Sequence, residues 1–186
     1  MENCAEWNSL EIAKLVIPVI TTILFGAFAL WLEARFFDKL EDARWFSHKI
    51  VEQRLQLFES VAPALNDFLC YSQRIGNWKE ITPKQLLEHK RKLDKQMHVF
   101  APLYSSDLLE HYKQFMSLCF ATYTGVGQDA KLRLRSEKYQ QLSSWQADYD
   151  TLFCASDQCT PVEQIVVAYH LLMANFAKEL GLHQKC

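Results

Sequence analysis

The hydrophobic pattern divides the chain into one unbroken apolar run and a longer part in which apolar and polar positions alternate. Residues 15–32, LVIPVITTILFGAFALWL, are eighteen positions without a charged side chain. At 1.5 Å per residue, an α-helix over residues 12–32 spans about 30 Å, which is the thickness of the hydrocarbon core of a bilayer. The run therefore predicts a transmembrane helix over residues 12–32.

Two other interpretations of the apolar run are a buried core helix and a cleaved signal peptide. A core helix normally keeps a polar stripe, whereas the polar side chains of this run are Thr21 and Thr22, which can bond to carbonyls of their own helix. Trp31 lies at the end of the run, as is typical of an aromatic residue at a membrane interface. The segment before the run is acidic and the run is long for a signal peptide. We therefore expect a permanent anchor.

The charges that flank the run predict its orientation. Residues 1–14 contain one basic residue, Lys14, and residues 33–52 contain four. These four are Arg35, Lys39, Arg44 and Lys49. Because cytoplasmic flanks carry the excess of Lys and Arg, we expect a single-pass protein of the inner cell membrane. Residues 1–11 would form a short extracytoplasmic tail and residues 33–186 a cytoplasmic domain.

From Leu40 onward, apolar residues recur at helical spacing between charged ones. Five glycines and five prolines in 186 residues leave few breaks, which favours helices over a sheet. Two capping boxes, Thr82-Pro83-Lys84-Gln85 and Thr160-Pro161-Val162-Glu163, each place proline at the first helical position. The predicted fold class is all-α: the transmembrane helix continues into a cytoplasmic antiparallel bundle of about five helices.

The breaker residues predict the helix boundaries. The long first helix should kink or break near residues 61–63 because of Pro63, and end near Arg74 and Gly76. The second helix begins at the first capping box and stops before Pro102. The three remaining helices are expected from Ser105 or Ser106 to Gly125, over residues 129–153, and from the second capping box to Gly181.

Composition and motifs narrow the classes of function. The formal net charge of −2 gives no reason to expect nucleic acid as a partner. Six irregularly spaced cysteines in a mainly cytoplasmic chain predict thiols rather than disulfides. No phosphate-binding loop, dinucleotide-binding glycine pattern, zinc-protease motif or serine-hydrolase elbow is present in the sequence. We therefore predict neither an enzyme nor a cofactor.

A weak metal candidate consists of Cys154, Cys159 and His170. Thiolate and imidazole are zinc ligands, and the spacing of the two cysteines falls within a loose range for such sites. A tetrahedral site needs four ligands, however, and the sequence offers no evident fourth. The favoured interpretation is two ordinary cysteines that flank a loop.

Two basic stretches give a second candidate. The second helix carries Lys90, Arg91 and Lys95 beside His89 and His98. The other stretch contains Lys131, Arg133, Arg135 and Lys138. Each is either a solvated helix face, which is the favoured interpretation, or a binding face for an anionic partner such as lipid headgroups or a nucleotide.

Pro18, Thr22, Gly26 and Ala29 line one side of the membrane helix with small or weakly polar groups. Such a stripe allows two helix backbones to approach closely, although it equally suits a face toward lipid. Besides the lipid bilayer, we therefore expect the chain to contact either further copies of itself, as a homo-oligomer, or a partner protein.

Three functions fit the sequence. The leading hypothesis is a membrane-anchored helical interaction protein, one version of which is a toxin-like effector that oligomerises or binds a partner to act at the membrane. The second is a membrane-tethered ligand sensor with a small-molecule site in the core of the bundle. The third is an enzyme of unrecognised type that acts on lipid.

Overall fold

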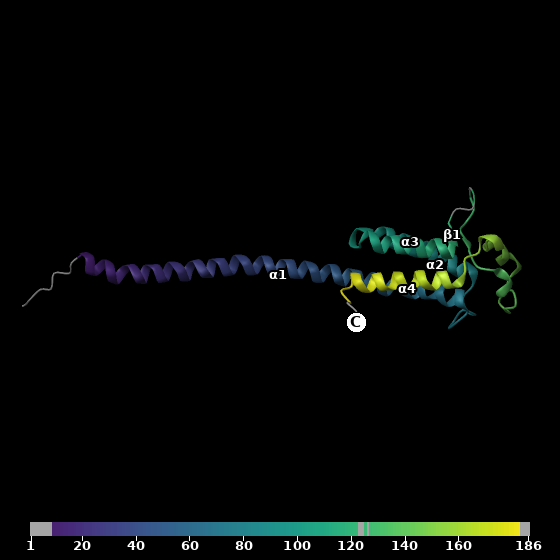
Figure 1. The fold of residues 1–186 in the computed structure, drawn as a ribbon, viewed down its shortest axis with the longest axis horizontal. Helices are drawn as coiled ribbons and strands as arrows, with labels where there is room; N and C mark the ends of the chain where they lie inside the picture. The colour runs from purple at the N-terminus through teal and green to yellow at the C-terminus, as the bar shows by residue number, and fades with distance from the viewer. Residues whose placement is uncertain (1–8, 123–124, 126, 183–186) are drawn as a thin grey trace, which may run out of the picture. The chain divides into compact units, whose positions relative to one another are not determined.

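The computed structural model describes residues 9–122, 125 and 127–182, which are mostly helical, as predicted (Figure 1). Its four α-helices are α1 (Ser9–Gln73), α2 (Pro83–Val99), α3 (Ser106–Cys119) and α4 (Val162–Glu179). A short antiparallel pair joins β1 (Phe120–Ala121) to β2 (Lys131–Leu132), with Phe120 opposite Leu132. The 3₁₀ turns are η1 (Ala101–Leu103), η2 (Ser136–Lys138), η3 (Ala147–Leu152) and η4 (Ser156–Gln158). The chain divides into two compact units, Met1–Lys49 and Ile50–Cys186, which are described separately below.

The N-terminal unit contains the apolar run. Within the described residues one helical window, Val16–Glu33, is long and apolar enough to cross a membrane, with a mean hydropathy of 1.9 and none of its residues buried. The Thr21 hydroxyl donates to the Ile17 carbonyl at 2.9 Å and the Thr22 hydroxyl donates to the Pro18 carbonyl at 2.7 Å. Both hydroxyls are therefore satisfied inside the helix, as predicted. Residues 1–8 of the expected tail lie outside the described residues.

In the C-terminal unit, α1 is amphipathic and buries Leu57, Val61 and Leu65. The expected break near Pro63 is wrong, because α1 is helical through this residue. Proline removes one intrahelical hydrogen bond, but Val61 and Leu65 are fully buried on either side of it, and their packing keeps the helix intact.

The ends of α1 and the start of the next two helices follow the sequence signals. After α1, Arg74 takes a φ of +60° and the Ile75 N–H donates to the Cys70 carbonyl at 3.0 Å. The Gln85 N–H donates to the Thr82 hydroxyl at 3.3 Å, and the Thr82 N–H donates to the Gln85 side chain at 2.8 Å. This reciprocal pair confirms the first capping box. Ser105, the expected cap, accepts from the Leu108 N–H.

The expected end of the third helix at Gly125 is wrong. Helix α3 ends at Cys119, and the next two residues form β1. The predicted helix residue Tyr123 lies outside the described residues.

The expected helix over residues 129–153 is also wrong. This segment contains β2, η2 and η3, so the described residues form four α-helices rather than about five. Its sequence explains the error. Ala130, Leu132 and Leu134 are buried, while the basic residues between and after them are half-buried or exposed. An alternation with a period of two positions is the pattern of a strand, not of a helix.

The second capping box does not form. Pro161 precedes α4 and no side chain caps the helix. The Thr160 N–H instead donates to the Arg133 carbonyl at 2.8 Å, which ties this segment to the residue after β2. Helix α4 nevertheless begins within two residues of the expected position, and Gly181, with a φ of +74°, follows its end as predicted.

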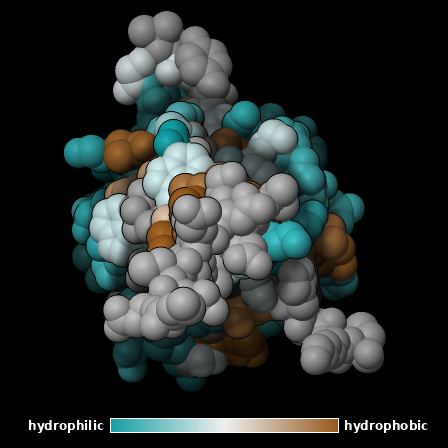
Figure 2. All heavy atoms as spheres, turned by 90° about the vertical axis from the view of Figure 1, so that its left-hand side faces the viewer, coloured by the Kyte–Doolittle hydropathy of each residue, from teal (hydrophilic) through white to brown (hydrophobic). Residues whose placement is uncertain are grey.

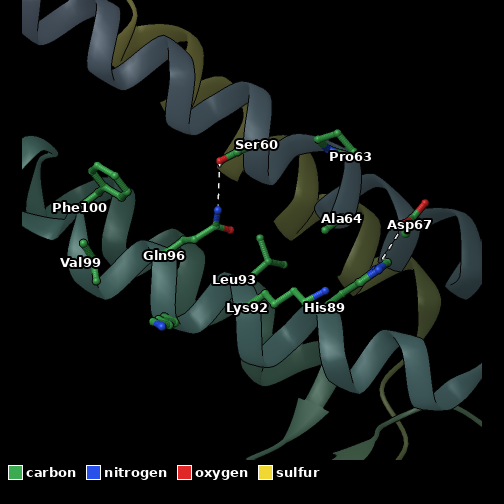
Figure 3. Close-up of a pocket in the computed structure, with 11 residues that line it drawn as sticks. Ser60, Pro63, Ala64, Asp67, His89, Lys92, Leu93, Gln96, Val99 and Phe100 are labelled. Carbon is green, nitrogen blue, oxygen red and sulfur yellow. Dashed lines mark hydrogen bonds and ion pairs between the residues drawn. The ribbon is translucent and has the colours of Figure 1, made fainter.

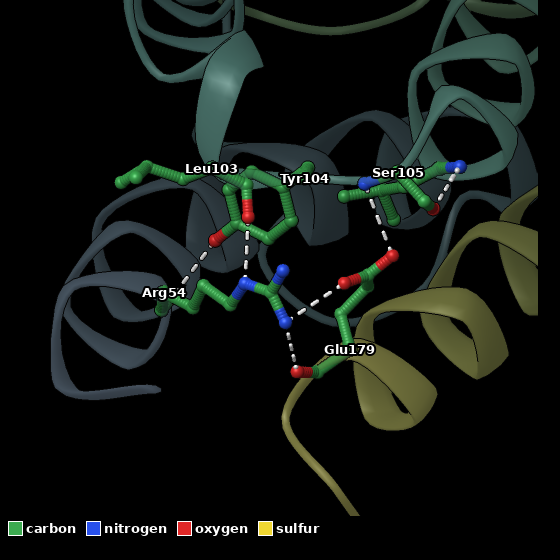
Figure 4. A network of polar contacts seen from close by, with 6 residues as sticks. Arg54, Leu103, Tyr104, Ser105 and Glu179 are labelled. Carbon is green, nitrogen blue, oxygen red and sulfur yellow. Dashed lines mark hydrogen bonds and ion pairs between the residues drawn. The ribbon is translucent and has the colours of Figure 1, made fainter. Parts of the chain in front are cut away.

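A polar network around Arg54 joins three segments near the start of the C-terminal unit (Figure 4). The Arg54 guanidinium donates to the Leu103 carbonyl at 2.6 Å and to the Glu179 carbonyl at 2.9 Å, and it pairs with the Glu179 carboxylate at 2.9 Å. The other Glu179 oxygen accepts from the Ser105 N–H at 3.1 Å, and the Tyr104 hydroxyl donates to the Arg54 carbonyl at 2.8 Å. The network therefore fixes α1 against the start of α3 and the end of α4.

Candidate functional site: a groove between α1 and α2

A groove of about 700 Å³ lies between α1 and α2 in the C-terminal unit (Figure 3). Its apolar lining consists of Pro63, Ala64, Leu93, Val99 and Phe100. Val99 is 63% exposed, and Phe100 beside it is half-buried. The groove thus offers unburied apolar surface beside the packed core.

Two polar contacts cross the groove from α2 to α1. The Gln96 side chain donates to the Ser60 hydroxyl at 3.3 Å. The Nδ1 atom of His89 lies 3.5 Å from a carboxylate oxygen of Asp67. That distance is too long for a hydrogen bond, and the buried Nδ1 atom has no hydrogen-bond partner. The pair therefore gains Coulomb energy only when the imidazole is protonated.

Charge in the groove is predominantly positive. Lys92 and Lys95 line it, are exposed, and form no ion pair with any carboxylate in the described part of the chain. Asp67 is the one carboxylate in the lining. Apolar walls beside two unpaired ammonium groups suit an amphipathic, negatively charged binding partner.

The structure divides the basic residues that the sequence placed on one face of α2. Lys90 is 8% exposed and pairs with Asp94, which also accepts from the Tyr112 hydroxyl at 2.7 Å. Burial, followed by the hydrogen bond to Asp94, raises the pKa of Tyr112. Arg91 pairs with Asp129, so only Lys95 of the three reaches the groove. The expectation of a solvated face is therefore wrong for Lys90, because its side chain is buried and pairs with the partly exposed Asp94 carboxylate.

The second basic stretch follows the strand rather than a helix. Arg133 donates to the Gln158 carbonyl at 3.4 Å, and its Nε atom is buried without a partner. Lys131 is half-buried, whereas Arg135 and Lys138 are exposed. These four side chains therefore do not form the single helical face that the sequence suggested.

The weak metal candidate is not assembled. In the described part of the chain, no three His, Cys, Asp or Glu side chains converge as metal ligands, so Cys154, Cys159 and His170 do not meet as a set. Both cysteines are free thiols. Burial is the main cause that raises the pKa of each thiol, which disfavours the thiolate that a metal binds.

The small-residue stripe of the apolar helix is exposed along its length. Pro18, Thr22, Gly26 and Ala29 are all exposed, and a Cβ atom on Gly26 would meet no other atom within 4 Å. Nothing in the described residues obstructs the close approach of another helix there.

The interior of the C-terminal unit is closely packed where the sensor hypothesis placed a ligand. A cavity among Phe68, Leu86 and Ile165 measures about 10 Å³, too small for a small molecule. The rings of Tyr71 and Tyr139 stack nearby with their centroids 4.5 Å apart. A space of ligand size lies instead in the surface groove of about 700 Å³. The face displayed in Figure 2 carries separate hydrophobic spots among hydrophilic residues.

Sequence reasoning identified parts of the groove but not the groove itself. Lys95, which the sequence placed on a basic side of α2, lines the groove. The His89 and Asp67 pair was missed, because a contact between two helices depends on their packing and leaves no spacing signal in the sequence. Comparisons with protein-family models, curated proteins and solved structures found no match for this chain.

Proposed function

We propose that this chain is a membrane-anchored helical interaction protein whose C-terminal unit binds a partner protein through the groove between α1 and α2. The observation that carries the anchor is the exposed apolar window Val16–Glu33. Phe25 is 75% exposed and Ile23 65% exposed. Burying each such side chain is worth about 1.5–3 kcal/mol, so this helix requires an apolar environment that the described chain does not provide.

The groove defines the chemistry of the partner. An amphipathic helix can lay its apolar side against Val99 and Phe100, while carboxylates on its flank pair with Lys92 and Lys95. We therefore propose an acidic amphipathic helix as the bound segment.

A photo-crosslinking amino acid placed at position 99 in the full chain tests this proposal, with one at exposed Lys113 on α3 as the matched control. We expect position 99, but not 113, to crosslink a partner through an acidic amphipathic segment identified by mass spectrometry. The double variant Lys92→Glu, Lys95→Glu should abolish that product. A crosslink that survives the charge reversal, or a neutral partner segment, would rule the proposal out.

The anchor is tested by extracting membranes of expressing cells at alkaline pH. We expect the full chain to stay in the membrane pellet, with the C-terminal unit accessible to protease only from the cytoplasmic side. Release into the supernatant contradicts the anchor, and protection from a cytoplasmic protease contradicts the orientation.

A ligand sensor is the second candidate, because a groove of about 700 Å³ lies within the size range of small-molecule sites. The same lining then suits an anionic amphiphile. Native mass spectrometry of the purified full chain distinguishes the two candidates. A bound amphiphile that is lost in Lys95→Glu would favour the sensor over partner binding.

The oligomerising version of the proposal rests on the small-residue stripe. A Gly26→Leu substitution meets no atom of its own chain, so any effect reports a contact with another helix. We expect fewer oligomers in detergent than in the control Ile23→Leu, which leaves the stripe unchanged. Equal oligomer fractions would remove the stripe from the proposal.

A further inference from the structure

A second pocket, of about 520 Å³, lies at the end of α1 and shares no lining residue with the groove described above. It is formed by the end of α1, the turn that follows it, the end of η2 and the residues just after η2. Its polar and aromatic lining consists of Gln73, Arg74, Trp78, Lys79, Lys138 and Gln141.

Three cationic side chains converge on this pocket without a carboxylate in the lining. Arg74, Lys79 and Lys138 are exposed, and none forms an ion pair within the described part of the chain. Lys84 and Lys90, by contrast, pair with Asp148 and Asp94. Like charges that are held together repel one another, so this cluster favours a multiply charged anion.

The backbone at Arg74 points to the same conclusion. Its φ of +60° lies in the left-handed region, at a helix end where glycine is the favoured residue. An arginine here is strained, and strained residues cluster at binding sites. The arginine adds a planar guanidinium that can bind phosphate through two parallel hydrogen bonds.

The remaining lining suits a flat polar ring. Trp78 is half-buried and presents part of its indole at the pocket, with the Lys79 ammonium 5.8 Å from the ring centroid. The side-chain amides of Gln73 and Gln141 each provide donors and an acceptor for the edge of such a ring. A phosphate that carries no ring would leave these groups unused.

We propose that this pocket binds a nucleoside polyphosphate. The phosphates contact Arg74, Lys79 and Lys138, and the base lies against Trp78. The site is independent of the groove and of the proposed interaction function, and either can be disproved without the other.

Calorimetric titration of the purified full chain in detergent with ATP tests the site. The key variant is Arg74→Gly, because glycine accepts the positive φ, so the substitution removes the side chain with its guanidinium while the backbone conformation is kept. We expect saturable ATP binding that weakens about tenfold in Lys138→Gln, the loss typical of one charge-assisted hydrogen bond, and by more than that in Arg74→Gly, which removes a group able to form two. Lys113→Gln, which changes an exposed lysine on α3, should bind ATP as the unmodified chain does. Thermal unfolding of Arg74→Gly should show a melting temperature that is unchanged or raised.

Two other probes separate the sources of phosphate. Tripolyphosphate has the charge without the ring, and sn-glycerol 3-phosphate represents a lipid headgroup. We expect tripolyphosphate to bind more weakly than ATP and glycerol phosphate to bind more weakly still. Equal affinity for tripolyphosphate and ATP, tighter binding of glycerol phosphate, unchanged ATP affinity in Arg74→Gly, or no saturable ATP binding would each overturn the proposal.

Discussion

The two ends of α1 share one helical backbone but have opposite surfaces. Over Val16–Glu33 the helix is apolar on all sides and none of it is buried. In the C-terminal unit the same helix is amphipathic, with Leu57, Val61 and Leu65 almost completely buried. A helix that is apolar all round needs apolar surroundings on every side, whereas an amphipathic one needs a single packed face. The comparison indicates that packing against the protein core stabilises the second region, whereas no residue of the window Val16–Glu33 is buried.

The largest expected effect comes from the buried region. Leu65→Ala leaves a cavity at a side chain that is 0% exposed and should reduce the free energy of unfolding of the C-terminal unit by about 3 kcal/mol. Leu24→Ala, the same change at a side chain that is 61% exposed, should leave that free energy unchanged. Urea denaturation of the full chain in detergent, followed by near-ultraviolet circular dichroism, measures both. An equal loss in the two variants would end the distinction between the regions.

A charge introduced into the apolar region should have the next largest effect. Leu24→Arg places a guanidinium in the middle of the window and should disfavour membrane insertion by about 3 kcal/mol. Leu55→Arg, at a position that is 44% exposed in the amphipathic region, is the matched control. The fraction of chain that floats with membranes in a density gradient should fall only for Leu24→Arg. Flotation of both variants would show that something other than lipid covers the window.

A smaller effect is expected where the amphipathic region is tied to the rest of its unit. Arg54 and Glu179 are 24% and 12% exposed, so losing one partner leaves a partly buried charge. Arg54→Ala should reduce the free energy of unfolding by about 2 kcal/mol, and Glu179→Gln added to it should cost less than it does alone. Denaturation curves of the two single variants and the double variant give the coupling. Strictly additive losses would show that the pair does not act as a unit.

The sequence was sufficient for features that depend on neighbouring residues. The apolar window, the Thr82 capping box and the glycine after α4 are set by a few adjacent positions, and all three were correctly predicted. The helix predicted over residues 129–153 was wrong. The aromatic residues of this segment fit a helical period, but Ala130, Leu132 and Leu134 alternate with polar residues as in a strand. The second capping box was wrong because Thr160 has a partner distant in sequence, the Arg133 carbonyl.

The candidate sites were less predictable, because each joins segments that only folding brings together. Lys138 was singled out in a basic stretch, but its pocket partners Arg74 and Lys79 lie about sixty residues earlier in the chain. The burial of Lys90 against Asp94 was equally invisible, since a lysine and an aspartate four positions apart also form ordinary surface pairs. Candidate site residues could be chosen from the sequence, but which of them lie together could be seen only once the helices were packed.

The smallest predicted effect is a pH dependence at the Arg54 network. Burial, opposed by the neighbouring Arg54 guanidinium, raises the pKa of Tyr104 from 10.0 to about 12. The folded chain therefore holds this proton more tightly than the unfolded chain, so the contribution is fully present below pH 10 and is lost as the pH rises toward 12. Tyr104→Phe removes the hydrogen bond to the Arg54 carbonyl and should reduce the free energy of unfolding by about 1 kcal/mol at pH 8. Between pH 9 and pH 11, this variant should lose less stability than the unmodified chain, because it has no phenol at position 104 to titrate. Urea denaturation at the three pH values measures both quantities. Tyr104 belongs to the network that fixes the amphipathic region of α1, so Tyr104→Phe should not change the fraction of chain that floats with membranes. A change in that fraction would show that the two regions of the helix are coupled.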